Sequence, residues 1–115
     1  MIKSKSIYIS PHPGDGERLY VDCLWPEGLT TRGAALAQWL QEVAPSYELW
    51  RHHYDLTEWE DYRQGYWKEL QAADKRRALN ELKEKARSGV ITLLYGTSDA
   101  KRNNAELLKE FLECN

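Results

Sequence analysis

The sequence predicts an α/β protein with a single domain, built on a mainly parallel sheet that carries helices on both faces. Two observations predict this class. Short apolar runs alternate along the chain with amphipathic helical patterns, which is the order of successive βαβ units. The chain has 115 residues, of which 42% are hydrophobic, so residues 1–115 have room for one core and enough apolar side chains to fold around it.

Three apolar runs predict strands. Residues 5–9 end at a loop rich in proline and glycine, which stops a strand. Residues 18–25 form an almost continuous apolar run, and such a run fits a strand covered on both faces. Residues 90–95 give the clearest strand pattern in the chain. Residues 34–45 fit both helical and strand spacing, and the periodicity slightly favours a helix.

Helical patterns begin in the first half of the chain. A short helical piece is expected to begin near Thr31, and Ser46 is expected to cap a helix that buries Leu49 and Trp50. The capping box Thr57-Glu58-Trp59-Glu60 then predicts the start of a longer helix. The apolar face of that helix recurs at three- and four-residue steps and comprises Trp59, Tyr62, Tyr66 and Leu70.

Two more helices are predicted in the second half. Asp74 is expected to cap the first, and Gly89, just beyond its end, is expected to supply a left-handed turn. The inward face of this helix comprises Ala78, Leu79, Leu82 and Ala86. The terminal helix buries Ala105, Leu108, Phe111 and Leu112.

Composition excludes several classes of function. Sixteen Lys and Arg against eighteen Asp and Glu are mixed along the chain, so no basic stripe indicates a nucleic-acid partner. The longest uncharged apolar run, residues 90–95, is far shorter than the ~20 residues of a membrane span. Residues 1–6 lack an apolar secretion core, so we expect a cytoplasmic protein without a membrane partner. Cys23 and Cys114 form no cluster with the histidines, so neither a metal nor another cofactor is expected.

The predicted sheet points to the place where a ligand would bind. Ligands of parallel sheets gather at the carboxyl ends of the strands, where loops and helix N-termini meet. The loops that leave the predicted strands are residues 11–16, 26–31 and 96–104. We therefore expect a functional site, if the chain has one, among these loops.

Asp22 is the first candidate, because it lies inside an apolar strand. An isolated buried charge is costly, so this carboxylate must be paired, capped or functional. Arg18 and Arg63 are its expected partners, and we predict that Asp22 and Arg63 lie within salt-bridge distance or share a ligand. Trp25, at the end of the same strand, either packs against the core or provides a stacking surface for a ligand ring.

Further candidates lie on the later elements. Tyr66 and Tyr95 carry phenols that buried sites usually satisfy with hydrogen bonds. Asp99, Asn103 and Asn104 precede the terminal helix. They either cap its free amide groups or help that end of the helix to bind an anion.

Several segments resemble the bacterial YeaO-like family of small cytosolic proteins. Residues 15–28, DGERLYVDCLWPEG, are similar to the signature DG-x-R-hydrophobic-hydrophobic-VDRLWPRG. Residues 44–49 resemble APS-x-EL, residues 59–66 resemble W-x-x-FR-x-x-Y, and residues 93–105 resemble LLYxAKD-x-x-x-NNA. The resemblance covers nearly the whole chain, and it implies a further strand at residues 38–44. The expected sheet then has about four strands.

Four positions depart from that pattern. Cys23, Glu27, Trp50 and Ser98 stand where the pattern carries positive charge. If the family binds an anion through those groups, this chain has lost much of the clamp.

Three functions remain open. The first is binding of a small polar or anionic ligand, with or without a reaction. The candidate ligand-binding residues are Arg18, Asp22, Trp25, Arg63, Tyr66, Tyr95, Asp99 and Asn103. The second is a non-enzymatic interaction domain or a homo-oligomer, suggested by five tryptophans and seven tyrosines. Nucleic-acid binding is the third. No nucleophile triad or metalloprotease motif assigns a reaction.

Overall fold

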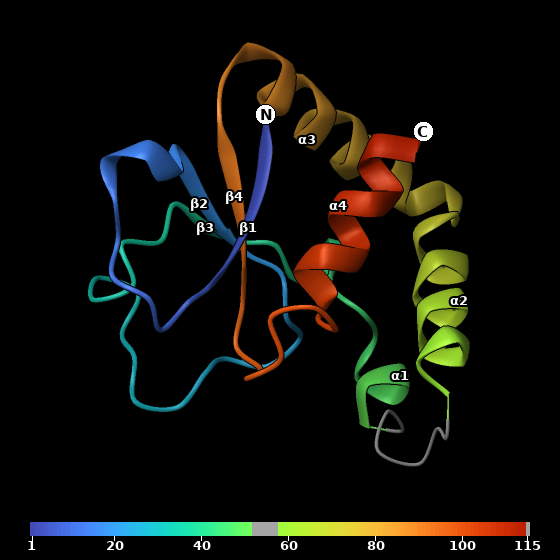
Figure 1. Cartoon of the computed structure of the whole chain (residues 1–115). Coiled ribbons are helices and arrows are strands. Elements are labelled where there is room, and N and C mark those ends of the chain that lie inside the picture. The colour runs from blue at the N-terminus through green and yellow to red at the C-terminus, as the bar shows by residue number, and fades with distance from the viewer. Residues whose placement is uncertain (52–57, 115) are drawn as a thin grey trace.

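The computed structural model describes residues 1–51 and 58–114. Within them, four strands form one sheet in the order β1-β4-β2-β3, and every neighbouring pair is parallel. The strands are β1 (Ile2–Ser6), β2 (Glu17–Tyr20), β3 (Gln38–Trp39) and β4 (Ile91–Tyr95). The predicted α/β class and its mainly parallel sheet are confirmed (Figure 1).

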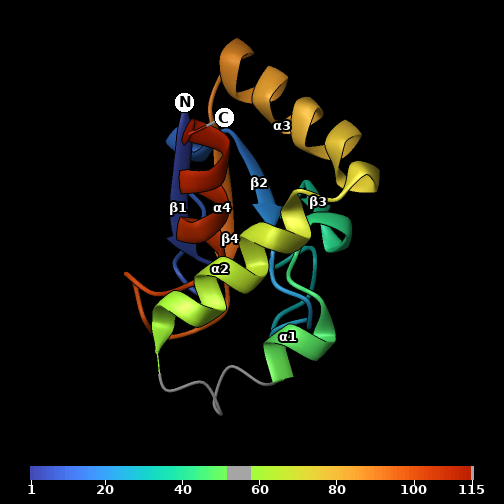
Figure 2. The ribbon, with the colours of Figure 1, turned by 90° about the vertical axis from the view of Figure 1, so that its right-hand side faces the viewer.

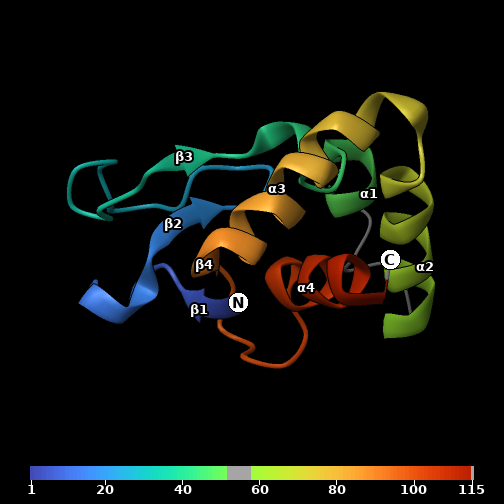
Figure 3. The same ribbon diagram turned by 90° about the horizontal axis from the view of Figure 1, so that it is seen from above.

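The helices of the described chain are α1 (Tyr47–Arg51), α2 (Trp59–Leu70), α3 (Arg76–Ser88) and α4 (Asn104–Cys114). In Figure 1, α2, α3 and α4 all lie on the same side of the sheet. Figure 2 faces that side and shows α4 running alongside β1 and β4. Helix α2 runs obliquely on the same side of the sheet. Figure 3, seen from above, shows loops on the opposite side. Helices therefore cover one face, whereas the sequence predicted helices on both.

The two faces of the sheet bury different kinds of segment. On the helical face, Leu19, Ile91 and Leu93 pack in the larger core against residues of α2, α3 and α4. On the other face, Tyr20 and Leu94 pack against Trp25, Leu29, Leu36 and Trp39. Trp25, Leu29 and Leu36 come from the irregular segment between β2 and β3, and Trp39 is the last residue of β3, so a loop and an edge strand cover this face in place of a second layer of helices.

The helix expected near Thr31 does not form. Residues 31–35 make turns, and the hydroxyl of Thr30 accepts a hydrogen bond from the amide of Gly33 at 2.9 Å. The prediction was wrong because Gly33 lies in the middle of the segment, and glycine weakens a helix that has little length to compensate.

Strand boundaries differ from the prediction at three places. The first strand occupies residues 2–6 and not 5–9, and Tyr8 and Ile9 beyond it are exposed. This strand lies at the edge of the sheet, where Lys and Ser are tolerated, so its polar residues concealed it. Strand β2 ends at Tyr20, and β3 contains only two residues before a 3₁₀ turn at Gln41–Val43. The ambiguous region therefore contains the predicted strand in shortened form.

Some helix caps were predicted correctly and others were not. Ser46 caps α1, because its hydroxyl accepts from the amide of Leu49 at 3.1 Å. Asp74 instead lies in a 3₁₀ turn before α3 and makes no cap. Gly89 has φ of −178°, which is extended and not left-handed. Thr57, the first residue of the predicted capping box, lies outside the described residues.

Candidate functional site

A pocket of about 450 Å³ opens at the carboxyl ends of the strands, where the sequence placed a site. Its walls come from the last residue of β2, from the segments that follow β1, β2 and β4, and from one residue of α1. The described lining residues are Tyr8, Tyr20, Asp22, Leu24, Trp25, Pro26, Glu27, Trp50, Gly96, Thr97 and Ser98. We call this cavity the strand-end pocket.

Asp22 is one of the residues that line this pocket, and it is only 6% exposed. Its Oδ2 accepts a hydrogen bond from the amide of Gly96 at 2.7 Å, and its Oδ1 accepts one from Asn104 Nδ2 at 2.8 Å. The hydroxyl of Tyr62 donates to Asn104 Oδ1 at 2.6 Å. This chain of contacts joins the end of β2 to the end of β4, to α4 and to α2.

Asp22 makes no ion pair within the described residues, so its charge is held by neutral donors alone. Burial raises the pKa of this carboxyl group, while the hydrogen bonds from Gly96 and Asn104 act to lower it. Gly96 is needed at this contact. A Cβ there would lie 3.0 Å from the Tyr20 hydroxyl oxygen and 3.4 Å from Asp22 Oδ2.

Aromatic rings surround the same strand end. Trp25 packs edge-on against Tyr20, with ring centres 5.4 Å apart, and lies 5.3 Å from the ring of Trp39. The Tyr20 hydroxyl donates to Leu24 O at 2.7 Å, which fixes the chain after β2. Burial raises the pKa of Tyr20, so its hydroxyl remains protonated at neutral pH. Tyr20 and Trp25 line the pocket, and Trp39 packs against both of their rings.

The predicted partnership of Asp22 with Arg18 is wrong. Arg18 Nη1 instead lies 2.6 Å from Asp15 Oδ2, and Arg18 Nε donates to Ala34 O at 2.9 Å. The reason is strand geometry, since residues four apart along an extended chain are separated by about 13 Å. Arg18 therefore reaches back toward the beginning of β2, while Asp22 lies beyond its end.

The predicted contact between Asp22 and Arg63 is also wrong. Arg63 pairs with Glu60 at 2.9 Å and Glu110 at 3.6 Å, and its guanidinium lies 4.0 Å from the centre of the Trp67 ring. It is the preceding residue on α2, Tyr62, that turns inward toward the Asp22 network. Neighbouring helical residues point about 100° apart, so only one of the two faces the core.

Four other candidates do not line the strand-end pocket. Tyr66 is fully buried and donates to Val43 O at 2.5 Å, and Tyr95 is buried in the core at the end of β4. Asp99 Oδ1 accepts from the amides of Lys101 and Arg102. Asn103 Oδ1 caps α4 by accepting from the amide of Glu106 at 2.8 Å. Of the predicted set, the pocket lining includes Asp22 and Trp25.

Sequence reasoning missed two features of the site. Tyr20 was not selected, although it lies two residues before Asp22, and alternate strand residues share a face. Asn104 was interpreted as a cap, whereas its side chain bonds to Asp22. No local pattern could reveal that bond, since it joins residues 82 positions apart.

Three of the four departures from the YeaO-like pattern meet in this pocket. Glu27, Trp50 and Ser98 all line it, whereas Cys23 lines a separate cavity of about 520 Å³ beside Ser46. The described lining of the strand-end pocket includes no Lys, Arg or His. Its charged groups are the carboxylates of Asp22 and Glu27.

A second buried carboxylate lies at the beginning of β2. Asp15 is 6% exposed and accepts hydrogen bonds from Lys5 Nζ at 2.9 Å and from Arg18 Nη1 at 2.6 Å. Burial acts to raise the pKa of Asp15, but hydrogen bonds from Lys5, the His12 amide and Arg18 outweigh it and lower the pKa to about 2. Lys5 and Arg18 both form ion pairs with Asp15, so these three side chains make a structural cluster.

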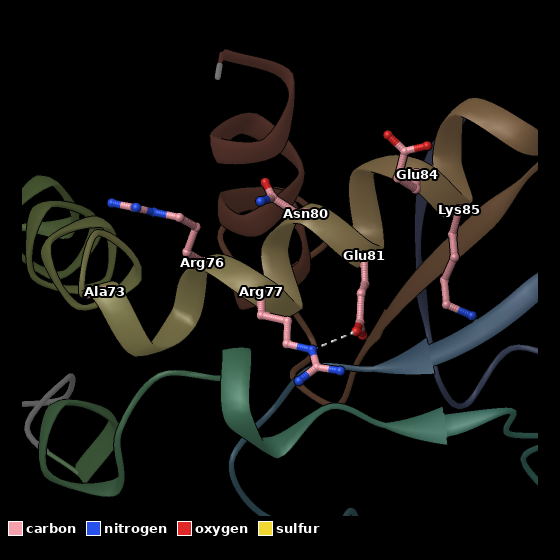
Figure 4. A pocket seen from close by; sticks show the side chains of 7 residues that line it. All are labelled: Ala73, Arg76, Arg77, Asn80, Glu81, Glu84 and Lys85. Atoms are coloured by element: carbon pink, nitrogen blue, oxygen red, sulfur yellow. Dashed lines mark ion pairs between the residues drawn. The ribbon is translucent and has the colours of Figure 1, made fainter.

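Another cavity, of about 740 Å³, lies along the outer surface of α3. Its lining residues all come from the single run 73–85, and Figure 4 shows their side chains pointing in different directions. Arg77 pairs with Glu81 at 3.5 Å, and Lys85 pairs with Glu17 at 2.8 Å. The groove gathers no convergent polar groups, so it is a weaker candidate than the strand-end pocket.

The part of the chain that the structure describes has neither a metal-binding cluster nor a membrane-spanning helix. Residues 1–51 and 58–114 contain no group of three or more His, Cys, Asp or Glu side chains arranged to hold a metal ion. None of the described helices has the length and apolar character needed to cross a membrane.

The comparisons with known proteins concern the whole chain. The family described as "Inactive DUF488-N3 subclade" matches residues 1–115. The chain is 32% identical over 112 residues to the uncharacterized protein YeaO of Escherichia coli, covering 96% of each chain. It is 30% identical over 113 residues to the uncharacterized protein Rv3073c of Mycobacterium tuberculosis, covering 96% of this chain and 92% of that one. No solved structure matches. The chain therefore belongs to the inactive DUF488-N3 subclade, the family of YeaO-like proteins whose signature its strands and loops resemble.

Proposed function

We propose that this protein is a cytoplasmic binding module that takes a small polar ligand in the strand-end pocket and does not transform it. The observation that carries the proposal is the position of Asp22. It combines an almost fully buried carboxylate with an open pocket of about 450 Å³ at the carboxyl ends of a parallel sheet. Ligand pockets of α/β proteins occur at this edge and commonly have volumes of this order.

Binding without chemistry fits the groups that line the pocket. The described lining has no histidine or cysteine. Its aliphatic hydroxyl groups, those of Thr97 and Ser98, lie on an exposed loop, and an unactivated hydroxyl is a weak nucleophile. Both oxygens of Asp22 already accept hydrogen bonds from the protein. The word "inactive" in the description of the family agrees with this picture.

The pocket favours a polar ligand over an anionic one. An anion requires positive charge or several free donors, and the described lining offers carboxylates and aromatic rings instead. Arg18 and Arg63, the two cations among the candidate site residues, are both engaged in ion pairs elsewhere. The YeaO-like pattern is basic at positions 27, 50 and 98, but this chain carries Glu27, Trp50 and Ser98 there. The pocket therefore lacks the positive charge that an anion would require.

A thermal-shift screen with a matched pair of variants tests the proposal. The panel contains neutral, cationic and anionic small metabolites, and a ligand that binds only the folded state must raise the melting temperature. Ser98→Trp fills the mouth of the pocket from an exposed position. Lys101→Trp places the same ring on the same loop at a residue outside the lining. We expect at least one panel member to stabilise the parent and Lys101→Trp but not Ser98→Trp.

The opposite outcomes are equally definite. A panel that leaves the parent unchanged, or a ligand that stabilises Ser98→Trp as well as the parent, would contradict the proposal. If the parent also proved dimeric by light scattering, the interaction-domain alternative would replace it, with the exposed Tyr8, Ile9 and Leu24 as the first surface to mutate.

A further inference from the structure

We propose that the ligand of the strand-end pocket is a small organic cation carrying an alkylated ammonium group. This inference rests on the proposed function and specifies its ligand. The geometry that points to it is the meeting of two carboxylates and four aromatic rings around one cavity without a basic side chain in its described lining.

The electrostatic argument begins with Asp22. Its negative charge is held only by the Gly96 amide and the Asn104 side chain, with the Tyr20 hydroxyl at 3.5 Å. Neutral donors solvate a carboxylate without cancelling its charge. Glu27 adds a second carboxylate at the exposed side of the same pocket. The field in the cavity is therefore negative, and it favours a cation over a neutral or anionic ligand of similar shape.

Three basic residues of the fold are held away from this charge by other carboxylates. Arg18 and Lys5 are held by Asp15 at 2.6 and 2.9 Å, at the other end of β2. Arg63 is held by Glu60 and Glu110 on the surface of the helices. Each has partners that a reorientation toward the pocket would leave unpaired, at an energetic cost.

The rings determine which kind of cation fits best. Tyr8, Tyr20, Trp25 and Trp50 line the cavity, and Tyr8 is 53% exposed. A cation over the face of a tyrosine or tryptophan is attracted by the negative charge at the centre of the ring. An alkylated ammonium is weakly hydrated and presents apolar methyl groups, so it loses less on leaving water than a bare ammonium. The mixed lining of rings and carboxylates matches both properties of this group.

Calorimetric titration of the full chain with choline and with 3,3-dimethylbutan-1-ol tests the inference. The two probes have nearly the same shape, and only choline carries the charge. We expect choline to bind roughly tenfold or more tightly than the neutral alcohol, as cation–π attraction with carboxylate assistance supplies. Acetate and inorganic phosphate complete the set as anions and are expected not to bind.

Two isosteric variants separate local charge from overall charge. Glu27→Gln removes a carboxylate from the pocket and should weaken choline binding several-fold. Glu113→Gln makes the same change at an exposed position near the end of α4, far from the pocket, and should leave binding unchanged. Equal effects of the two substitutions would overturn the inference, because they would show that only net charge matters.

The remaining outcomes distinguish the inference from the function on which it rests. Preferred binding of the neutral alcohol or of an anion, abolished by Ser98→Trp, would overturn the cation and leave the binding module standing. Choline binding that Ser98→Trp does not disturb would overturn the cation site, because the choline would lie elsewhere. Absence of binding by all the probes would overturn the inference, and absence in the wider metabolite panel would remove the proposed function as well.

Discussion

Asp15 and Asp22 flank the same strand, and each is only 6% exposed, yet the protein accommodates their charges in opposite ways. Asp15, before β2, is enclosed by Lys5 and Arg18. Asp22, after β2, is held by an amide and a carboxamide. The pKa of Asp15 is lowered to about 2, whereas burial raises the pKa of Asp22.

The difference separates the structural role of Asp15 from the binding role that we propose for Asp22. A carboxylate that is surrounded by cations has little left to offer to a ligand. A carboxylate that is solvated by neutral groups keeps its charge, and here it does so beside an open cavity. At the amino end of β2, Asp15 is already paired with two cations. At the carboxyl end, Asp22 is bonded only to neutral donors, and we propose that its charge attracts a ligand.

Replacing Asp15 should give the largest loss of stability. Asp15→Asn leaves Arg18 charged, 4% exposed and without its carboxylate. We expect a loss of about 4 kcal/mol in the free energy of unfolding, typical of breaking one side of a buried pair. Urea denaturation at pH 7 measures it. Glu17→Gln, which removes an exposed partner of Lys85, should cost about 0.5 kcal/mol or less; similar losses for both would contradict the buried pair.

Asp22→Ala should cost slightly less, about 3 kcal/mol, because it strands neutral donors and not a charge. The Gly96 amide and Asn104 Nδ2 both lose their acceptor. Asp22→Asn restores an oxygen and should recover part of the loss, whereas Asp15→Asn cannot recover any cation pairing. Denaturation curves of the four variants, with alanine and asparagine at each site, therefore sharpen the comparison. An Asp22→Asn variant as unstable as Asp15→Asn would show that Asp22 also depends on a cation.

The two aspartates should respond oppositely to acid. The folded pKa of Asp15 lies below its usual 3.8, so its stabilisation is complete above pH 4 and is lost as the pH falls toward 2; the total is roughly 2 kcal/mol. The folded pKa of Asp22 lies above 3.8, so its contribution becomes less favourable as the pH rises above that value. The stability gap between the parent and Asp15→Asn should therefore narrow in acid. A gap that stayed constant from pH 7 to pH 2 would contradict the assignment.

The smallest expected effect comes from the outer part of the Asp22 network. Tyr62→Phe removes the hydroxyl that donates to Asn104 Oδ1 at 2.6 Å and should cost about 1 kcal/mol. Tyr8→Phe removes an exposed hydroxyl that donates to Glu27 O and serves as the matched control. Thermal unfolding of both variants measures the difference. If Tyr62→Phe melted no lower than Tyr8→Phe, the network would end at Asn104.

The parts that the sequence predicted are those that local pattern determines. Residues 91–95, the amphipathic face of α4 and the Ser46 cap were all visible as periodicity or capping chemistry. The parallel order of the elements then placed the pocket at the correct edge of the sheet. Asp22 was identified as requiring partners because a charge in an apolar run must be satisfied.

The parts that the sequence did not predict depend on tertiary geometry. The partner of Arg18 depends on a 3₁₀ turn at Pro13–Asp15 that folds Asp15 back toward it. The partner of Asp22 is the side chain of Asn104, which a one-dimensional pattern assigns to capping. Strand β1 was predicted three residues too late because an edge strand carries polar residues. Each miss arose where contacts distant in sequence outweighed a local preference.

Carbon-13 NMR of the aspartate carboxyl groups, followed through a pH titration with and without choline, reads both ends of β2 in one experiment. We expect the Asp15 signal to titrate near pH 2 and to ignore choline, because Lys5 and Arg18 already neutralise it. We expect the Asp22 signal to titrate above 3.8 in the free protein and to move to lower pH when choline is added, since a bound cation favours the carboxylate. If choline left the Asp22 titration unchanged, or if both aspartates titrated below 3.8, the carboxyl end of β2 would be as closed as the amino end and would have no cation to bind.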